Sequence, residues 1–409
     1  MLRSCTLSSL VLGFVAGVAG ANDLSDSLFA APIRSSPGAY IPAGSTLNAP
    51  VITPLTTRHG GQIFEVTPAG RNRNTVLTHD PEGYLSGPSS RGHAKTNECA
   101  GWLTLEYLYW ATQGPSVPAL VTTGVEGNPT TQTLLGGERM LNGLRSGFRI
   151  SGGIFVDSAN RWALSFSTIS LGSRSERLAG GSDGTTLLNL PDYTLLNGAP
   201  VPNYVAFPGS SRGTATASAQ TSFFSGDTHL SRVYQSGNGF RFDLLGGYRF
   251  LQLGDSISES SDSVQLFAPN ARTMRERSIR TRNYFDGGEI GFSTQGRLGR
   301  LAFEMQTTVA LGATTTQTDR SFTISEFGFL GAVAPLIQTG GRTAQSDFAV
   351  VPQLGLKLGW QPMDHVRITA GYDLIYWSRV RRAQELFTGS DAATDFWAQG
   401  LSLGAELRY

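Results

Sequence analysis

The chain ends in "GLSLGAELRY", residues 400–409, in which apolar side chains alternate with polar or small ones. Successive side chains of a β-strand point to opposite faces, so one face of this segment carries Leu401, Leu403, Ala405, Leu407 and Tyr409. Chain ends usually fray into polar tails because they have nothing to bury against. An apolar strand here is therefore predicted to pair with another strand and to be covered, either by a protein core or by lipid.

The same alternation recurs in nine segments upstream of this strand. Seven are clear and lie at 102–110, 144–156, 161–170, 240–250, 300–311, 347–360 and 365–377. Two weaker segments, 222–235 and 284–296, place Arg232 and Asp286 on the apolar face, which predicts a bulge or an irregular register there. We therefore expect ten strands, or twelve if parts of the long loops extend as hairpins.

The connections between these segments alternate between short and long. The short ones are "DSAN" at 157–160, "SGNG" at 236–239, "RLGR" at 297–300 and "QPMD" at 361–364. All long connections then fall at one end of the sheet, which is typical of a transmembrane antiparallel β-barrel. A β-sandwich has no reason to sort its loops in this way, although a soluble secreted β-sandwich or a surface-adhesive protein stays open as a third interpretation.

Alternation alone does not say which face of the sheet is inside. Aromatic residues recur near the strand ends, as expected for girdles at the two membrane interfaces, so the apolar face is predicted to contact lipid. The opposite face is then predicted to line the lumen, with the charged residues Glu106, Arg145, Arg149, Arg161, Arg241, Asp243, Arg249, Glu304, Lys357, Arg367, Asp373, Glu406 and Arg408. These charges either line a solute path or pair across the interior, and the narrowness of a ten-stranded barrel favours pairing.

The N-terminal region has a different character from the strands. Residues 1–21 combine Arg3, an apolar run and the small residues Ala19-Gly20-Ala21, which is typical of a cleaved secretory signal peptide. Residues 22–98 are rich in Pro, Gly, Ser and Thr without a period, and are predicted to be a disordered periplasmic extension. The barrel is expected to occupy residues 99–409.

Composition excludes several classes of protein. Charged residues make up 15% of the chain and the formal net charge is +1, which argues against a nucleic-acid partner. Of the two cysteines, Cys5 leaves with the predicted signal peptide, so Cys99 has no partner for an internal disulfide or a zinc site. No cofactor or metal site is predicted.

One group of residues supports an enzyme hypothesis. Asp227, His229 and Ser231 in "DTHLS" share one face of a predicted strand, and outer-membrane phospholipases place a Ser and a His two residues apart on a strand. A triad is recognised by its geometry and not by spacing, so a hydrolase using Ser231 and His229 is the alternative, and catalytic residues are not expected.

Several stretches resemble one family. They are "GWLTLEYLYWATQGPSVPALVTT" from Gly101, "LLGG" at 134–137, "GLRSGFRISGGIFVD" from Gly143, "RFDLLGGYRFLQL" from Arg241, "ITAGYDLIYWSRVRRA" from Ile368 and "DFWAQGLSLGAELRY" from Asp395. They are similar to the β-barrel porin 7 family of bacterial outer-membrane proteins. The resemblance implies an outer-membrane barrel and offers no established substrate and no catalytic residue to carry over.

The final strand also resembles the C-terminal signal by which the barrel-assembly machinery recognises outer-membrane proteins, through Ser402, Gly404, Leu407 and Tyr409. The expected location is the bacterial outer membrane, with both termini in the periplasm and lipid and the assembly machinery as partners. The expected function is porin-like passive passage of small solutes or a structural role in that membrane.

Overall fold

The computed structural model describes residues 101–125, 128–196, 199–268, 271–328, 333–388 and 391–409. They all lie in the second of the two units into which the chain divides, residues 75–409. The predicted signal peptide, the predicted extension and Cys99 lie outside the described residues.

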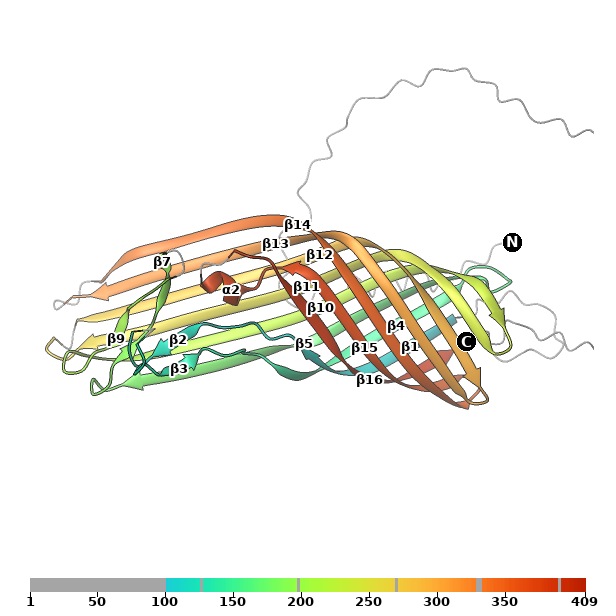
Figure 1. Ribbon diagram of the computed structural model, residues 1–409, viewed down its shortest axis with the longest axis horizontal. Helices are drawn as coiled ribbons and strands as arrows, with labels where there is room; N and C mark the ends of the chain where they lie inside the picture. Colours follow the sequence, from blue (N-terminus) through green and yellow to red (C-terminus); the bar gives the residue numbers. More distant parts are fainter. Residues whose placement is uncertain (1–100, 126–127, 197–198, 269–270, 329–332, 389–390) are drawn as a thin grey trace, which may run out of the picture. The chain divides into compact units, whose positions relative to one another are not determined.

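Ten antiparallel strands close into a barrel, as the sequence predicts (Figure 1). They are β1 (Gly101–Thr112), β4 (Gly143–Phe155), β5 (Trp162–Ser182), β10 (Ser211–Gly237), β11 (Phe240–Gln265), β12 (Arg272–Leu298), β13 (Leu301–Phe327), β14 (Val333–Met363), β15 (Val366–Val380) and β16 (Thr394–Arg408). Each pairs with its neighbour along the chain, and β16 pairs with β1 to close the ring. The β-sandwich interpretation is therefore wrong.

The apolar rows face outward. Leu105 is 60% exposed and Leu403 is 61% exposed, whereas Glu106 on the opposite face is 1% exposed. This is the reverse of a soluble barrel, in which apolar rows fill the interior. The outside is the surface that lipid covers.

Two rows of aromatic rings mark the edges of the lipid-facing band. Near the short turns, Phe242 lies 6.1 Å from Tyr234 and 5.7 Å from Phe292 between ring centroids. Toward the long loops, Phe250 lies 6.4 Å from both Phe224 and Tyr284. Eight residues separate the two rows on β11 and β12, so they stand about 20 Å apart along a tilted barrel, close to the height of an apolar membrane band. We call the two ends of the barrel the turn end and the loop end, and the second row the loop-end girdle.

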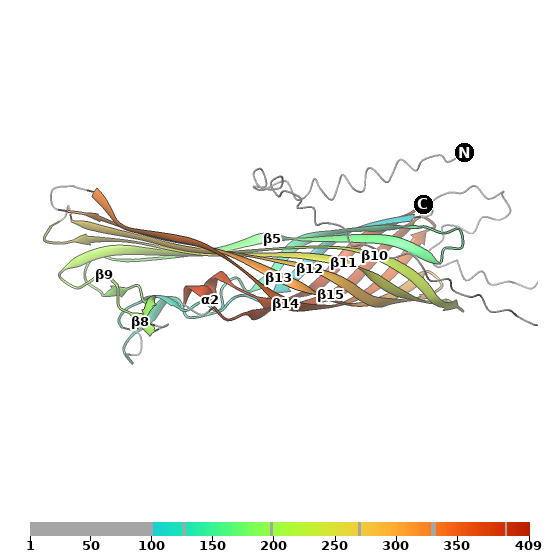
Figure 2. The same cartoon turned by 90° about the horizontal axis from the view of Figure 1, so that it is seen from above.

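The barrel strands differ greatly in length. Strands β1, β4, β15 and β16 have 12 to 15 residues, whereas β10 to β14 have 26 to 31. The long strands and β5 continue beyond the loop-end girdle as one sheet, here called the extended sheet (Figures 1 and 2). The sequence predicted these strands to end near the membrane, which is too short. Beyond the membrane neither face of a strand has to be continuously apolar, and the many Ser, Thr and Gly residues there hide the alternation of apolar and polar side chains.

The long connections cover the inner face of the extended sheet. Strands β2 (Ala119–Thr122), β3 (Thr133–Gly136), β6 (Leu188–Asn189) and β9 (Tyr204–Ala206) form a small sheet, joined by the hairpin β7 (Asp192–Leu196) and β8 (Ala199–Val201) and the helix α2 (Ala383–Phe387). We call these elements the cap. No helix among the described residues has the length and apolarity needed to span a bilayer.

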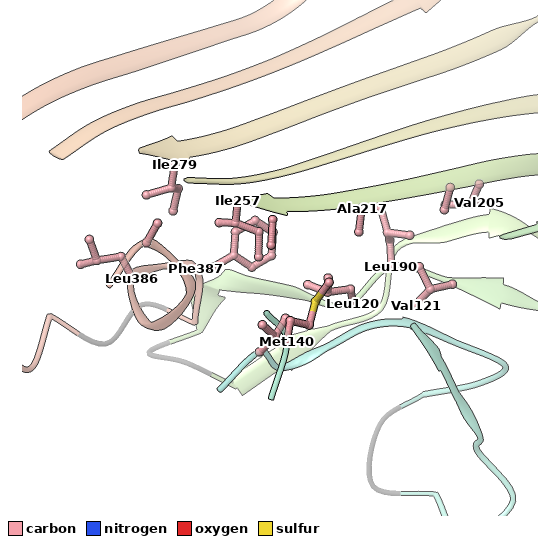
Figure 3. Packing of buried hydrophobic residues seen from close by; sticks show 14 of the residues in the cluster. Leu120, Val121, Met140, Leu190, Val205, Ala217, Ile257, Ile279, Leu386 and Phe387 are labelled. Atoms are coloured by element: carbon pink, nitrogen blue, oxygen red, sulfur yellow. The ribbon is translucent and has the colours of Figure 1, made fainter. Parts of the chain in front are cut away.

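A hydrophobic cluster joins the cap to the extended sheet. Leu120, Leu190 and Phe387 from the cap pack against Ala217, Ile257 and Ile279 of β10, β11 and β12 (Figure 3). The connection at 181–213, predicted to fold either inward as a plug or outward as an adhesive surface, contributes β6 to β9 and so folds inward.

The two residues on the unexpected face have different explanations. A bulge between Val233 and Gln235 lies next to Arg232, whose guanidinium stacks 5.2 Å from the Trp162 ring centroid at the turn end. Asp286 lies in a regular ladder and accepts a hydrogen bond from the Tyr248 hydroxyl just inside the loop-end girdle. The predicted irregularity is therefore confirmed beside Arg232 and wrong at Asp286.

Replacing Ile290 with Arg tests the outward face. Ile290 is 67% exposed on the lipid-facing side, between the midplane and the turn-end aromatic row, so we expect the charge to lower the free energy of unfolding in lipid vesicles by about 1–3 kcal/mol. Phe267→Arg is the matched control, since Phe267 is 86% exposed beyond the loop-end girdle. Equal denaturant midpoints for the two variants would contradict the assignment of the lipid-facing band.

Candidate functional site: the barrel interior

Buried ion pairs cross the lumen in the lipid-spanning part of the barrel. Glu106 on β1 accepts from Arg149 on β4 at 3.1 Å and from Lys357 on β14 at 3.1 Å, and Arg149 also reaches Asp373 on β15 at 2.9 Å. The side chains of Glu106, Arg149 and Asp373 are at most 4% exposed. Burying such charges is tolerated only when each is paired, so these contacts tie four strands together across the interior.

A second group of charges surrounds His229 on the other side of the lumen. Its Nε2 lies 2.8 Å from Glu289 and its Nδ1 lies 3.3 Å from Asp227, while Arg249 contacts the same two carboxylates at 2.9 and 3.7 Å. The Ser231 hydroxyl instead donates to the Ala163 carbonyl at 3.3 Å. Both imidazole nitrogens therefore face carboxylates, and the spacing of "DTHLS" does not give the Ser–His contact of a hydrolase.

The turn end carries further pairs. Arg241 contacts Asp243 at 2.8 Å, and Glu406 lies 2.5 Å from Arg408 and 3.8 Å from Arg367. These five residues are 3 to 8% exposed. Paired charges therefore occupy the lumen from the turn end up to the level of Arg249.

An apolar layer lies directly above the charged residues, toward the loop end. We call it the septum, and it contains Leu108, Trp110, Ile169, Leu171, Phe223, Leu251, Leu253, Phe285, Ala310, Ala349, Val351, Ile375, Trp377, Val380, Phe396 and Ala398. Every barrel strand except β4 contributes to it, and every member is at most 3% exposed. Phe285 and Leu251 adjoin Tyr284 and Phe250 in sequence, so the septum crosses the lumen at the level of the loop-end girdle.

Ring contacts hold the septum together. Trp377 lies 6.2 Å from Phe285 edge-to-face and donates its indole N–H to Thr314 at 2.8 Å, and Phe223 lies 5.2 Å from Phe396. Aromatic pairs at these separations add about 0.5–1.5 kcal/mol each beyond the burial of their surface. Lumen-facing side chains thus form a packed apolar core inside a membrane barrel.

The segment before α2 closes the loop end above the septum. Arg382, 2% exposed, donates its Nη2 to Asp255 of β11 at 3.1 Å and its Nη1 to the Gln113 carbonyl at 3.2 Å. The amide of Asn283 on β12 bridges the backbone of Arg381 through two hydrogen bonds of 2.9 Å, and Arg381 pairs with Asp347 of β14. We call residues 381–388 the latch.

A buried carboxyl lies where the cap meets the extended sheet, outside the lipid-spanning segments. Glu259 on β11 is 7% exposed, and its Oε1 has no hydrogen-bond partner among the described residues. Burial raises the pKa of Glu259 to about 8, against the opposing effect of the nearby Arg277 guanidinium. The adjoining cavity, lined by Asp192, Asn203 and Phe322 among others, has a volume of about 20 Å³, which is room for about one water molecule.

Most predicted lumen residues lie on the inner face. Twelve of the thirteen do so: ten take part in the ion pairs described above, Arg145 bonds to Thr112, and Glu304, which is only partly buried, is the cross-strand neighbour of Lys357. Arg161 is a correction, because it lies in the turn before β5 with a side chain 73% exposed, 4.0 Å from Asp157. A turn residue follows no strand alternation, so its inward assignment was wrong.

The residues named for the assembly signal divide between the two faces. Ser402 is buried in the lumen and Gly404 lies over Glu106, whereas Leu407 and Tyr409 are more than half exposed on the lipid side. The described residues contain no group of three His, Cys, Asp or Glu side chains placed to hold a metal ion.

The septum and the latch were missed from the sequence, yet the septum has a signal. In "YLYW" at 107–110, "FL" at 250–251 and "LIYW" at 374–377 both faces of the strand become apolar or aromatic near the loop end. A strand that is apolar on both faces is buried on both sides, or faces lipid on one side and a core on the other. The latch has no such signal, because Arg382 and its partner Asp255 are far apart in the sequence.

Removing the partner of Arg382 tests the latch. Asp255→Ala leaves a buried guanidinium without its carboxylate, so we expect local opening of residues 381–388 to become easier by about 3–5 kcal/mol. Hydrogen exchange of the latch amides measures this change. Asp319→Ala is the control, because Asp319 and its partner Arg342 are exposed and such pairs contribute about 0–1 kcal/mol. Unchanged protection in Asp255→Ala would contradict the assignment.

Glu259 predicts a pH dependence of cap docking. Because its pKa is raised in the docked state, its contribution is fully present below its ordinary value of 4.5 and is lost as pH rises through about 8. We expect hydrogen exchange of residues 188–206, corrected for the intrinsic pH effect, to accelerate over this window. In Glu259→Gln the dependence should disappear; if it persists unchanged in that variant, Glu259 is not its source.

Comparisons with known proteins gave one family match and several solved structures of low similarity. The family model described as "Putative beta barrel porin-7 (BBP7)" matches residues 102–391. A search of curated proteins gave no match. Solved structures with a similar course of the chain include the outer membrane protease OmpT from Escherichia coli, at 9% identity and a TM-score of 0.37, which covers 78% of this chain and 99% of that one.

Two further structures are similar at the same low level. The attachment invasion locus protein Ail of Yersinia pestis has 10% identity and a TM-score of 0.22, covering 76% of this chain and 99% of its own. A Pseudomonas aeruginosa FadL homologue has 9% identity and a TM-score of 0.24, covering 76% and 90%. The family match spans most of the chain and coincides with the ten-stranded barrel, and on this basis the protein belongs to the beta barrel porin-7 family of outer-membrane β-barrel proteins.

Proposed function

We propose that this protein is a structural barrel of the bacterial outer membrane, closed to solutes, which holds a capped sheet above the membrane surface. The observation that carries the proposal is the septum. Its members come from nearly the whole circumference of the barrel and are at most 3% exposed, so the lumen is filled at that level by packed apolar side chains. A porin needs a continuous aqueous path, and a barrel of about eight to ten strands leaves little space beyond its own side chains.

Two further layers support a closed barrel. Below the septum, Arg249 and Glu289 have side chains that are 0% exposed and contact each other at 2.9 Å. Above it, the latch inserts Arg382 between β11 and the segment after β1. A solute would have to displace a charge network, an apolar core and a buried ion pair in succession.

The same architecture supports a proposal for the orientation and export of the chain. We propose that the loop end faces the outside of the cell and that the turn end, where β1 begins and β16 ends, faces the periplasm. Residues 1–21 then act as the signal peptide, and residues 22–98 lie in the periplasm. The terminal strand, with Leu407 and Tyr409 turned to lipid, is offered to the barrel-assembly machinery.

We propose a structural role for the cluster around His229, in place of hydrolysis. His229 bridges Asp227 and Glu289, and Ser231 bonds to a backbone carbonyl, so an attacking hydroxyl has no base beside it. Lipase activity in the purified barrel that disappeared in Ser231→Ala would overturn this view.

Planar-bilayer recording distinguishes a closed barrel from a porin. We expect the folded wild-type protein to give no stepwise current, because the septum excludes water and ions from the lumen. Trp110→Ala combined with Trp377→Ala removes the two largest septum side chains, and we expect current steps to appear in that variant. Large-to-small changes of this kind cost about 3–5 kcal/mol each, so the folded state of the variant is verified first by its gel mobility without boiling.

The matched control replaces Tyr107 and Tyr109 with Ala. These residues lie on the same strand as Trp110 but face lipid, with 53% and 46% exposure. Their loss changes the contact with the bilayer and leaves the lumen intact, so this variant should stay silent. Regular current steps from the wild-type protein would refute the closed-barrel proposal and restore passive solute passage as the function.

A further inference from the structure

The outer surface changes character immediately beyond the loop-end girdle. On β10 and β11 the outward positions there are polar or small and carry no charge: Ser222, Gln220 and Ser218 on β10, and Gln252, Gly254, Ser256 and Ser258 on β11. On β12 the outward positions are Arg282 and Arg280, two and four residues beyond Tyr284. The buried residues Thr281 and Asn283, each 0% exposed, alternate with them and fix both arginines on the outer face.

The height of the two arginines places them at a membrane interface. Each residue of a tilted strand advances about 2.5 Å along the barrel axis, so Arg282 and Arg280 stand about 5 and 10 Å above the girdle. Aromatic girdles lie at the level where the apolar membrane gives way to headgroups. The guanidinium groups are therefore at the depth of lipid phosphates.

The local charges leave this surface positive. Within the described part of the chain, no ion pair involves Arg280 or Arg282. Asp319, the cross-strand neighbour of Arg280, is 3.5 Å from Arg342 on its other side. Glu276 lies on the same face of β12 but is four residues farther from the membrane than Arg280.

The neighbours of Arg282 leave room for a ligand. Its cross-strand partners are Gly254 on β11 and Gln317 on β13. A side chain at Gly254 would meet only the Ser222 hydroxyl at 2.9 Å, so the surface beside the guanidinium is low and lined with a hydroxyl. Farther out, the Ser218 and Ser258 hydroxyls bond to each other at 2.7 Å and continue this polar strip.

We propose that the strip formed by Arg280, Arg282 and the serines of β10 and β11 is a docking site for the phosphate-bearing headgroup of a lipid in the leaflet at the loop end. Guanidinium groups bind phosphate oxygens with paired N–H donors, and hydroxyl side chains serve the remaining oxygens. The acyl chains of the same lipid would lie against Phe250 and Tyr284 directly below. This inference concerns the outer surface and is independent of whether the lumen is open.

Native mass spectrometry of the purified full chain in detergent tests the site. The probes are phosphatidic acid, which carries a phosphate monoester, and phosphatidylcholine, whose phosphate is shielded by a cation. We expect the wild-type protein to retain phosphatidic acid in preference. Each arginine near a charged membrane surface contributes roughly a five-fold change in lipid affinity, so R282Q should lower retention by about that factor and R280Q/R282Q by more.

The control is R212Q, which removes one exposed arginine from the outer face of the same sheet ten residues beyond Ser222. We expect its retention of phosphatidic acid to match the wild type, and an excess of inorganic phosphate to leave the bound lipid in place. Unchanged retention in R280Q/R282Q, an equal loss in R212Q, or full displacement by inorganic phosphate would each overturn the proposal. Gel mobility without boiling verifies that every variant is folded.

Discussion

The pairing of β16 with β1 is the contact on which the rest of the structure depends. Lipid offers no hydrogen bonds, so every backbone N–H and C=O in the membrane must be satisfied within the sheet. The backbone pairing of β1 with β16, which runs from Trp102 opposite Arg408 to Thr112 opposite Ala398, supplies hydrogen-bond partners to the two edge strands that would otherwise be open. Closure also fixes the faces: once the ring is complete, each apolar row is outside and each charged row is inside.

Closure at ten strands then dictates what the interior contains. The lumen of so narrow a barrel is close to the size that side chains fill. The charges that alternate with lipid-facing residues must therefore meet partners, which explains why Glu106, Arg149 and Asp373 bridge three different strands. Arg149 also stacks 5.6 Å from the Trp110 ring centroid, so the charged residues and the septum form one continuous packing.

Beyond the membrane, lipid no longer requires all ten strands to form a closed ring. Short strands end near the loop-end girdle, so the extended sheet loses its opposite wall and its inner face would be exposed to water. The cap supplies that wall, since Leu120, Leu190 and Phe387 bury Ile257 and Ile279. The edges of the extended sheet on β5 and β14 remain in water, where backbone groups find partners that lipid does not provide.

The sequence by itself determined the architecture within the membrane. Alternation with a period of two, the sorting of short and long connections, and the aromatic strand ends predicted ten strands, their order and their lipid-facing side. These features are local, because lipid imposes the same rule on every strand wherever its neighbours lie. The family resemblance pointed to the same barrel, and the match over residues 102–391 confirms it.

Only the tertiary structure decided which inner residues meet and what closes the lumen. Arg382 reaches Asp255, and His229 reaches Glu289 and not Ser231, because strand register and tilt bring distant positions to the same height. The strand ends beyond the girdle were not predicted, and the turn residue Arg161 was predicted to face the lumen. Both lie outside the lipid-spanning part of the barrel, where side chains no longer have to alternate between apolar and polar. The alternation of side chains in one strand reflects what lies on each side of that strand. Contacts across the barrel depend on how all ten strands close into a ring, and the sequence of one strand does not contain that information.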